Sequence, residues 1–311
     1  MTRRSPLLLG AALLGLACKP KVVDLPICPE MVAAGAADES QTRELPIDVW
    51  FSILIRGFDR TGMDPGDDAR ECSNQPIAVN WPQEMATDPR ASARKLPRDA
   101  RTADDLTFSD GEEGEILVWA RVEELENGDA LGPVGLARWI ARGLEIRGIG
   151  SIQAPAQRVR MRLEPYGEIR MLVLESETCP KEQTDAAVPC PREVQVMPLE
   201  NQRFVSAHMF ENDKDMGPAR FLLVDDREEP LKDGWVRKYT LQRRLEFDGV
   251  TAVVHENIST KDCDPKNPAT PCEEHIAAQE QRVLSYKDGK IQTTPSAWDR
   301  VGKVKIEIPT E

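Results

Sequence analysis

The sequence predicts a mainly β protein that is built from antiparallel hairpins and contains little helix. Three observations support this fold class: strands that alternate between apolar and charged residues, an internal duplication, and cysteine pairs that enclose short polar loops. We therefore expect two related β units of about 80 residues each, with loops braced by disulfides.

The clearest strand lies at 158–164, where Val, Met and Leu alternate with charged side chains. A period of two is typical of a strand with one buried and one solvated face. Pro165 and Gly167 predict a turn after this strand, and the apolar residues within 169–173 predict the return strand.

Other segments extend this β pattern. Aspartate-glycine pairs at 248–249 and 288–289 predict two further hairpin turns, and alternation over 301–308 predicts a closing strand. The apolar run 49–55 predicts a buried strand, and 77–81 predicts another.

An internal duplication is the second observation. The motif E-N-x-x-x-[L/M]-G-P occurs at 126–133 and again at 211–218. Two later landmarks, an Arg-Leu-Glu turn region and a Pro-Cys pair, recur in the same order at nearly the same offset. Two copies are too few for a solenoid, so we expect a pair of similar β modules or one sheet made of two related halves.

These landmarks divide the chain. The expected parts are a signal peptide at 1–17, an N-terminal β segment with its tether at 18–82, a linker or long surface loop at 83–113, β repeat unit 1 at 114–196, and β repeat unit 2 with the C-terminal strands at 197–311. Proline, charge and small residues dominate the linker, whose single possible strand is 106–108. Residues 134–144 are the only plausible helix and suit a strand equally well.

Residues 1–17 have the features of an export signal. Arg3 and Arg4 precede an uncharged apolar run that is too short to span a bilayer. The run ends in Gly-Leu-Ala before Cys18 and resembles a bacterial lipoprotein signal, in which this cysteine becomes the lipidated N-terminus. The resemblance implies a firm anchor of several acyl chains, palmitate among them. Lys19 after the cysteine implies the outer membrane, at its periplasmic face or the cell surface.

Six further cysteines remain, and an even number in an exported chain predicts disulfides. Two pairs are close in sequence, and the third follows by elimination. The expected pairs are Cys179–Cys190, Cys263–Cys272 and Cys28–Cys72. The rival interpretation, a metal site, lacks any C-x-x-C spacing.

Charge and composition exclude several functions. Removal of 1–17 deletes two arginines and no acids, which leaves 38 basic against 53 acidic residues, a net charge of −15. An acidic surface repels phosphate, so we expect no nucleic-acid partner and membrane contact through the lipid anchor alone. Aromatic residues make up only 5% of the chain, and this scarcity argues against a carbohydrate-binding platform, which usually contains many of them.

Catalytic and metal-binding motifs are weak. Residues 211–215 place oxygens at alternate positions as calcium loops do, but the glycine falls at position seven and no glutamate stands at twelve. A site assembled from His208, His255 and Glu256 is conceivable, although surface histidines on a hairpin are more common. We therefore expect no metal, no cofactor and no enzymatic activity.

The sequence thus favours a membrane-anchored exported lipoprotein with a non-enzymatic binding or envelope-structural role, with another envelope protein as a possible partner. The alternative is a periplasm-facing carrier of lipid or another apolar ligand with a half-open β-barrel, similar in architecture to the lipoprotein carriers of the Lol pathway. A hydrolase is the third class, and no motif supports it.

The cysteine pairing is open to a direct test. Peptide mapping without reduction is expected to recover a peptide that links Cys179 to Cys190, because both residues flank one polar, proline-containing loop. A peptide that links Cys179 to Cys263 would contradict both this pairing and the alignment of the two repeat units.

Overall fold

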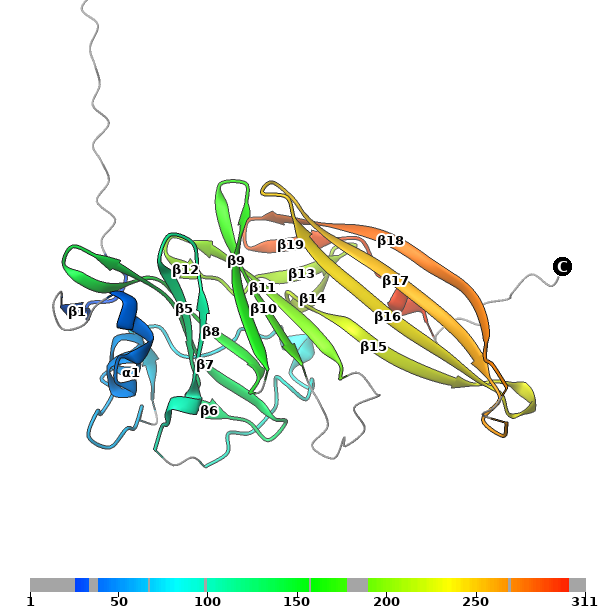
Figure 1. The fold of residues 1–311 in the computed structure, drawn as a ribbon, viewed down its shortest axis with the longest axis horizontal. Coiled ribbons are helices and arrows are strands. Elements are labelled where there is room, and N and C mark those ends of the chain that lie inside the picture. Colours follow the sequence, from blue (N-terminus) through cyan, green and yellow to red (C-terminus); the bar gives the residue numbers. More distant parts are fainter. Residues whose placement is uncertain are drawn as a thin grey trace, which may run out of the picture.

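The structure is a computed structural model that describes residues 26–33, 39–66, 68–97, 100–156, 158–177, 190–267 and 270–301. It confirms the mainly β fold: 17 strands form one large, mostly antiparallel sheet, and two short strands form a second (Figure 1). The signal peptide, Cys18, Cys179 and most of the expected closing strand at 301–308 lie outside the described residues.

The N-terminal part contains β1 (Val32–Ala33), η1 (Glu39–Glu44), α1 (Ile47–Leu54), β2 (Ile55–Arg56), β3 (Arg70–Glu71), η2 (Gln83–Met85) and η3 (Ala103–Asp105). The first half of the sheet contains β4 (Leu106–Asp110), β5 (Glu115–Ala120), β6 (Glu123–Glu124), β7 (Asp129–Ile140), β8 (Gly143–Pro155), β9 (Val159–Tyr166), β10 (Ile169–Glu177), β11 (Arg192–Glu200) and β12 (Arg203–Phe204). The second half contains β13 (His208–Glu211), β14 (Lys214–Pro218), β15 (Arg220–Pro230), η4 (Lys232–Gly234), β16 (Val236–Phe247), β17 (Ala252–Cys263), β18 (Glu273–Lys287), β19 (Lys290–Thr293) and η5 (Ala297–Arg300).

Strand pairing runs around the first half, and a hydrogen bond between its first and last strands closes it into a ring. The order is β4-β5-β7-β8-β12-β11-β10-β9, and the Met161 backbone N–H of β9 donates to Ser109 Oγ of β4 at 3.4 Å. Apolar side chains from these strands fill the ring and form the first core. Its members include Leu117, Trp119, Leu136, Ile152, Leu163, Leu172, Leu174 and Met197.

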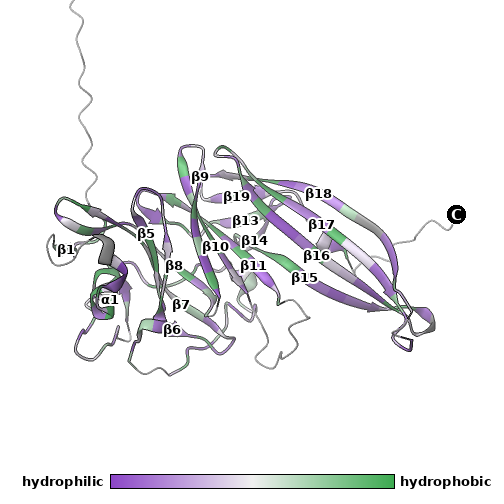
Figure 2. Cartoon of the chain, in the orientation of Figure 1, coloured by the Kyte–Doolittle hydropathy of each residue, from purple (hydrophilic) through white to green (hydrophobic). Residues whose placement is uncertain are grey.

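The second half forms another ring. Only Ala219 separates β14 from β15, and the order β15-β16-β17-β18-β19-β13-β14 returns to its start. Apolar side chains of these strands pack against β10 and β11 to form the second core. Hydrophobic and hydrophilic residues alternate in bands along β16 and β17, as expected for strands with one buried face (Figure 2).

Strands β10 and β11 are the wall between the two rings. Leu172 and Leu174 of β10 point into the first core, whereas Met171 and Val173 point into the second. All four side chains are at most 2% exposed. Residues 171–174 are therefore apolar on both faces, unlike the alternating strand that precedes them.

The segment 49–55 was expected to be a strand, and this expectation is wrong. It lies in α1, which begins after Pro46, and Trp50 to Leu54 are all buried. Periodicity cannot separate a buried helix from a buried strand in a continuous apolar run, because neither has a polar face. The expected strand at 77–81 is also absent; this described segment is irregular.

The structure confirms several other expectations about strands and hairpins. The strand at 106–108 is confirmed within β4, and 134–144 is strand in β7 and β8 rather than helix. All three expected hairpins form, with closing pairs Tyr166–Ile169, Phe247–Ala252 and Lys287–Lys290.

Two of the three expected disulfides are formed, Cys28–Cys72 with Cα atoms 5.1 Å apart and Cys263–Cys272 with Cα atoms 4.4 Å apart. The first joins the N-terminal segment to the β2–β3 hairpin, and the second closes the loop between β17 and β18. Cys190 is also disulfide-bonded, and its pairing with Cys179 stays a prediction.

The duplication also stays a prediction. Its motif forms a hairpin turn in both copies, before β7 and between β13 and β14. The tips at Gly167 and Gly249 touch, since the Gly167 N–H donates to the Gly249 carbonyl at 2.8 Å. Strand pairing differs, however: β16 pairs with β15 and β17, whereas β9 pairs with β10 alone among the described strands.

Gly132 in β7 tests the packing of the first half. A Cβ at this position would lie 1.8 Å from the Ala120 carbonyl oxygen, which is backbone and cannot rotate away. Gly132→Ala is expected to lower the free energy of unfolding by about 1–3 kcal/mol or more, measured by urea denaturation. Gly148→Ala is the control, because its Cβ would meet mainly side-chain atoms, at 3.0 Å and beyond. Equal effects would contradict this account.

Candidate functional site

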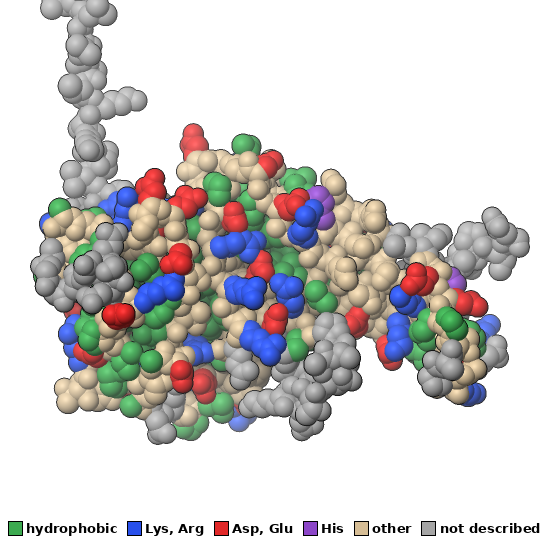
Figure 3. Space-filling model, in the orientation of Figure 1, with side chains coloured by type: hydrophobic (Ala, Val, Ile, Leu, Met, Phe, Trp, Pro, Cys, Tyr) green, Lys and Arg blue, Asp and Glu red, His purple; other side chains and the backbone are tan. Residues whose placement is uncertain are grey.

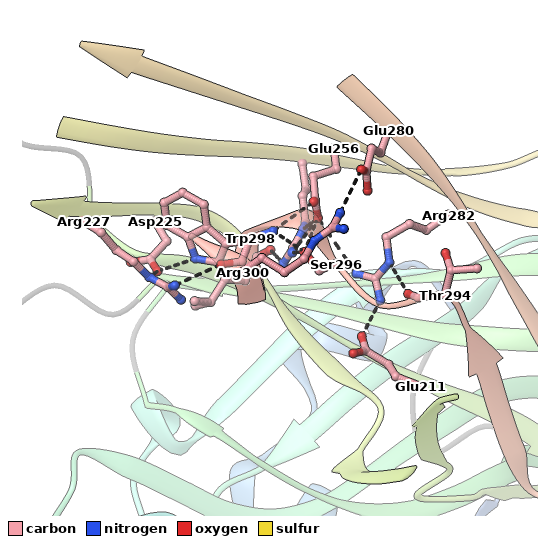
Figure 4. A network of polar contacts seen from close by, with 12 residues as sticks. Glu211, Asp225, Arg227, Glu256, Glu280, Arg282, Thr294, Ser296, Trp298 and Arg300 are labelled. Carbon is pink, nitrogen blue, oxygen red and sulfur yellow. Dashed lines mark hydrogen bonds and ion pairs between the residues drawn. The ribbon is translucent and has the colours of Figure 1, made fainter. Parts of the chain in front are cut away.

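A buried polar network lies inside the second half, between β13, β16, β17, β18 and η5 (Figure 4). Arg243 donates from Nε to Glu256 Oε2 at 2.6 Å, and Arg282 pairs with Glu211 at 2.5 Å. These four side chains are 9% exposed or less, although each is charged. Burial of charge is costly unless it is paired, and here the charges satisfy one another.

The network also holds η5 against the sheet. Ser296 donates from Oγ to Glu256 Oε2 at 2.7 Å, and the Trp298 backbone N–H donates to Ser296 Oγ at 3.0 Å. The Trp298 indole N–H donates to Asp225 at 3.0 Å, and the Arg227 guanidinium lies 4.4 Å from the centre of its ring. Trp298 is thereby fixed in a third apolar cluster with Tyr239, Leu241 and Ile258.

The two buried glutamates differ in pKa. Burial favours the neutral form of Glu256, but the charges of Arg243 and Arg282 and the hydrogen bond from Ser296 outweigh it, so its pKa lies below the ordinary value. At Glu211, burial outweighs the attraction of Arg282 and raises the pKa. Glu256 is therefore the carboxylate that the fold holds ionised.

The network is structural rather than catalytic. Ser296 faces a carboxylate, not an imidazole, and it is 1% exposed, so no substrate reaches it. The conceivable site of His208, His255 and Glu256 is not assembled. Glu256 is buried inside the ring, whereas His255 faces outward and pairs with Glu246 at 2.7 Å. His208 pairs with Asp215 in the β13–β14 hairpin.

The possible calcium loop is likewise an ordinary hairpin turn. Glu211 is bound by Arg282, Asp215 is bound by His208, and Asn212 and Asp213 adopt the positive φ angles of a turn. Among the residues that the structure describes, no group of three or more His, Cys, Asp or Glu side chains is placed to hold a metal.

Three hollows mark the surface. One of about 400 Å³ lies between the segment 81–90 and β14–β15, with Trp81, Met85, Met216 and Phe221 in its walls. Another of about 370 Å³ lies over β9, β10 and β11 among arginine and glutamate side chains. The third, of about 620 Å³, lies on the outer face of β16, β17 and β18 and is named the amide hollow below.

The amide hollow takes its name from four side chains. Gln242, Asn257, Gln279 and Gln281 are exposed and line it, and no hydrogen bond joins their carboxamides to any described residue. Strand register aligns them, since Asn257 stands opposite Gln242 on one side and opposite Gln279 on the other. Gln242, Asn257 and Gln279 thus form a row across three strands, and Gln281 stands beside the row, opposite His255.

The charges around the amide hollow are neutralised. Arg244 and His255 both contact Glu246 at 2.7 Å, and Glu280 pairs with Arg300 at 3.2 Å. Figure 3 shows the contrast: red and blue side chains alternate over the middle of the molecule, whereas tan covers much of the surface over the long strands beside it. Free hydrogen-bonding capacity in the amide hollow therefore belongs to uncharged groups.

Sequence reasoning missed the amide hollow. The four carboxamides lie on the central strand β17 and on its two sheet neighbours, β16 and β18, and are separated by up to 39 positions, from Gln242 to Gln281. Only strand register brings them together. The one signal of it in the sequence is that amide residues are neighbours of Arg243, Glu256 and Arg282. On a strand, such neighbours place the amides and the charges on opposite faces of the sheet.

Comparison of the chain with protein family models, with curated proteins and with solved structures found no match. Within the described part of the chain, no helix is both long enough and apolar enough to cross a membrane.

Glu256 tests the role of the buried network. Glu256→Gln removes the charge that neutralises Arg243, and we expect the free energy of unfolding to fall by about 3–5 kcal/mol at neutral pH. Because the folded-state pKa of Glu256 is depressed, its contribution is present above its unfolded pKa and is lost as pH falls through its folded pKa. The difference from wild type should therefore shrink below roughly pH 4 in denaturation curves.

The matched control is Glu228→Gln. Glu228 pairs with Lys238 at 3.0 Å, but both side chains are more than half exposed, so we expect a loss below about 1 kcal/mol. A loss for Glu256→Gln as small as that for Glu228→Gln would contradict the structural role of the network.

Proposed function

We propose that this protein is an exported lipoprotein, tethered to the outer membrane through Cys18, that acts by binding a ligand at the amide hollow rather than by catalysis. The observation that carries the binding role is the amide hollow itself: about 620 Å³ of space, lined by four carboxamides that have no partner within the described chain. Pockets of this size are typical of ligand sites.

The cysteines support export. Cys28–Cys72 and Cys263–Cys272 are disulfides, and stable disulfides occur in oxidising compartments such as the bacterial periplasm. The lipoprotein-like end of the signal, Gly-Leu-Ala-Cys, supports attachment to lipid at Cys18. Lys19 supports the outer membrane as the destination.

A non-catalytic role is supported by the arrangement of the reactive groups. The buried carboxylates Glu211 and Glu256 are paired with arginines and closed off from solvent. Around the amide hollow, His255 is held by Glu246, and the described residues that line the space include no serine, threonine or cysteine. A hydrolytic site needs a nucleophile or activated water beside a base, and this hollow offers neither arrangement.

The second candidate is a carrier of an apolar ligand. The hollow beside Trp81 and Met85 favours it, because apolar side chains from two segments face each other there. The hairpin faces do not provide such a space: they pack into the two cores, and the gap beside Tyr166, Met171 and Leu284 leaves no room for a water molecule. Acyl chains retained after gentle purification, and lost in Met85→Glu, would favour the carrier.

Cys18→Ser tests the anchor. Lipidation requires the thiol, so this variant is expected to leave the membrane fraction, whereas wild type remains in it and incorporates radiolabelled fatty acid. Cys28→Ser is unsuitable as a control because Cys28 is in a disulfide, so Lys21→Ala, next to the same tether, serves instead. Wild type that fractionates with membranes without incorporating label would refute acylation at Cys18.

A further inference from the structure

We infer that the amide hollow binds a neutral oligosaccharide. This inference rests on the proposed binding function and adds the class of ligand. It depends on two properties of the amide hollow: the chemistry of its free groups and the balance of its charges.

The free groups require an uncharged ligand that both donates and accepts hydrogen bonds. Each carboxamide offers two N–H donors and one carbonyl acceptor, and Gln242, Asn257 and Gln279 present these in one row. Neighbouring hydroxyls of a sugar ring, each a donor and an acceptor, match such a row. Anions and cations gain nothing comparable there, because Arg244, His255 and Glu280 already have charged partners.

Other classes of partner fit less well. Protein interfaces usually have an apolar or aromatic centre, and among the described residues that line the amide hollow none is apolar. Nucleic acid needs unpaired cations to contact its phosphates, and a chain with a net charge of −13 repels it. A second copy of this chain that met it through the same face would bring a hollow against a hollow and leave the space unfilled.

Recognition by carboxamides also agrees with the few aromatic residues of the chain. Sugar sites that stack rings need exposed Trp, Tyr or Phe, and none lines this space. Affinity should come from hydrogen bonds, so each lost carboxamide is expected to weaken binding roughly two- to tenfold. Binding should also be insensitive to added salt, because no unpaired charge takes part.

The test uses full-length lipidated protein in a zwitterionic detergent, because detergents with sugar headgroups would compete. Neutral oligosaccharides, including trimers of glucose and of N-acetylglucosamine, are titrated by calorimetry. We expect saturable, salt-independent binding of at least one oligosaccharide. The triple variant Gln242→Ala, Asn257→Ala, Gln279→Ala should lose it, and the conservative Asn257→Asp should weaken it.

Gln292→Ala is the matched control, since Gln292 is an exposed glutamine on β19 outside the amide hollow. It should bind as wild type does. Failure of every neutral oligosaccharide to bind, or unchanged binding in the triple variant and Asn257→Asp, would overturn the inference. A purified envelope protein that binds at the amide hollow where no sugar does would overturn it too, yet leave the proposed binding function standing.

Discussion

The fold depends on one constraint: β10 and β11 serve two cores at once. A strand between two cores must be apolar on both faces, so residues 171–174 carry Met, Leu, Val and Leu without a polar break. Where the second core ends, the strand changes character, and Glu175 and Glu177 appear on that face with arginine partners. The length of the shared wall thus determines how far the two rings overlap. Beyond it, β15 to β18 extend without a second sheet to cover them.

The buried charges follow from that uncovered extension. Its inner face is closed by the irregular segment at 294–301, whose backbone groups enter an apolar interior and need partners there. Charged side chains supply them. Arg282 donates to the Thr294 carbonyl at 2.7 Å, Arg227 donates to the Trp298 carbonyl at 3.0 Å, and Glu256 accepts from the Trp298 N–H at 3.3 Å. The backbone groups of a strand would find partners on a neighbouring strand, whereas those of a short 3-10 turn need side chains as partners.

Local patterns were predictable, and placement in space was not. The strand at 158–164 alternates strictly, so its hairpin followed from the sequence, and cysteines nine positions apart, at 263 and 272, indicated their pairing. Residues 49–55 were assigned to the wrong element because a run without a polar face fits a buried helix and a buried strand alike. The amide hollow was missed for a different reason: a bulge between Ile258 and Thr260 shifts the register of β17 against β18, and no sequence spacing reveals it.

The network and the amide hollow are two faces of the same short strand segments. Gln242 precedes Arg243, Asn257 follows Glu256, and Gln281 precedes Arg282, so three of the four outward carboxamides are adjacent in sequence to a buried charge. Side chains alternate across a strand, which means that the ion pairs fix the backbone from which the carboxamides project. A ligand that binds by hydrogen bonds gains affinity when the groups it meets lose little freedom on binding. The four buried charges therefore do more than cap η5: they also hold the outer row at fixed spacing.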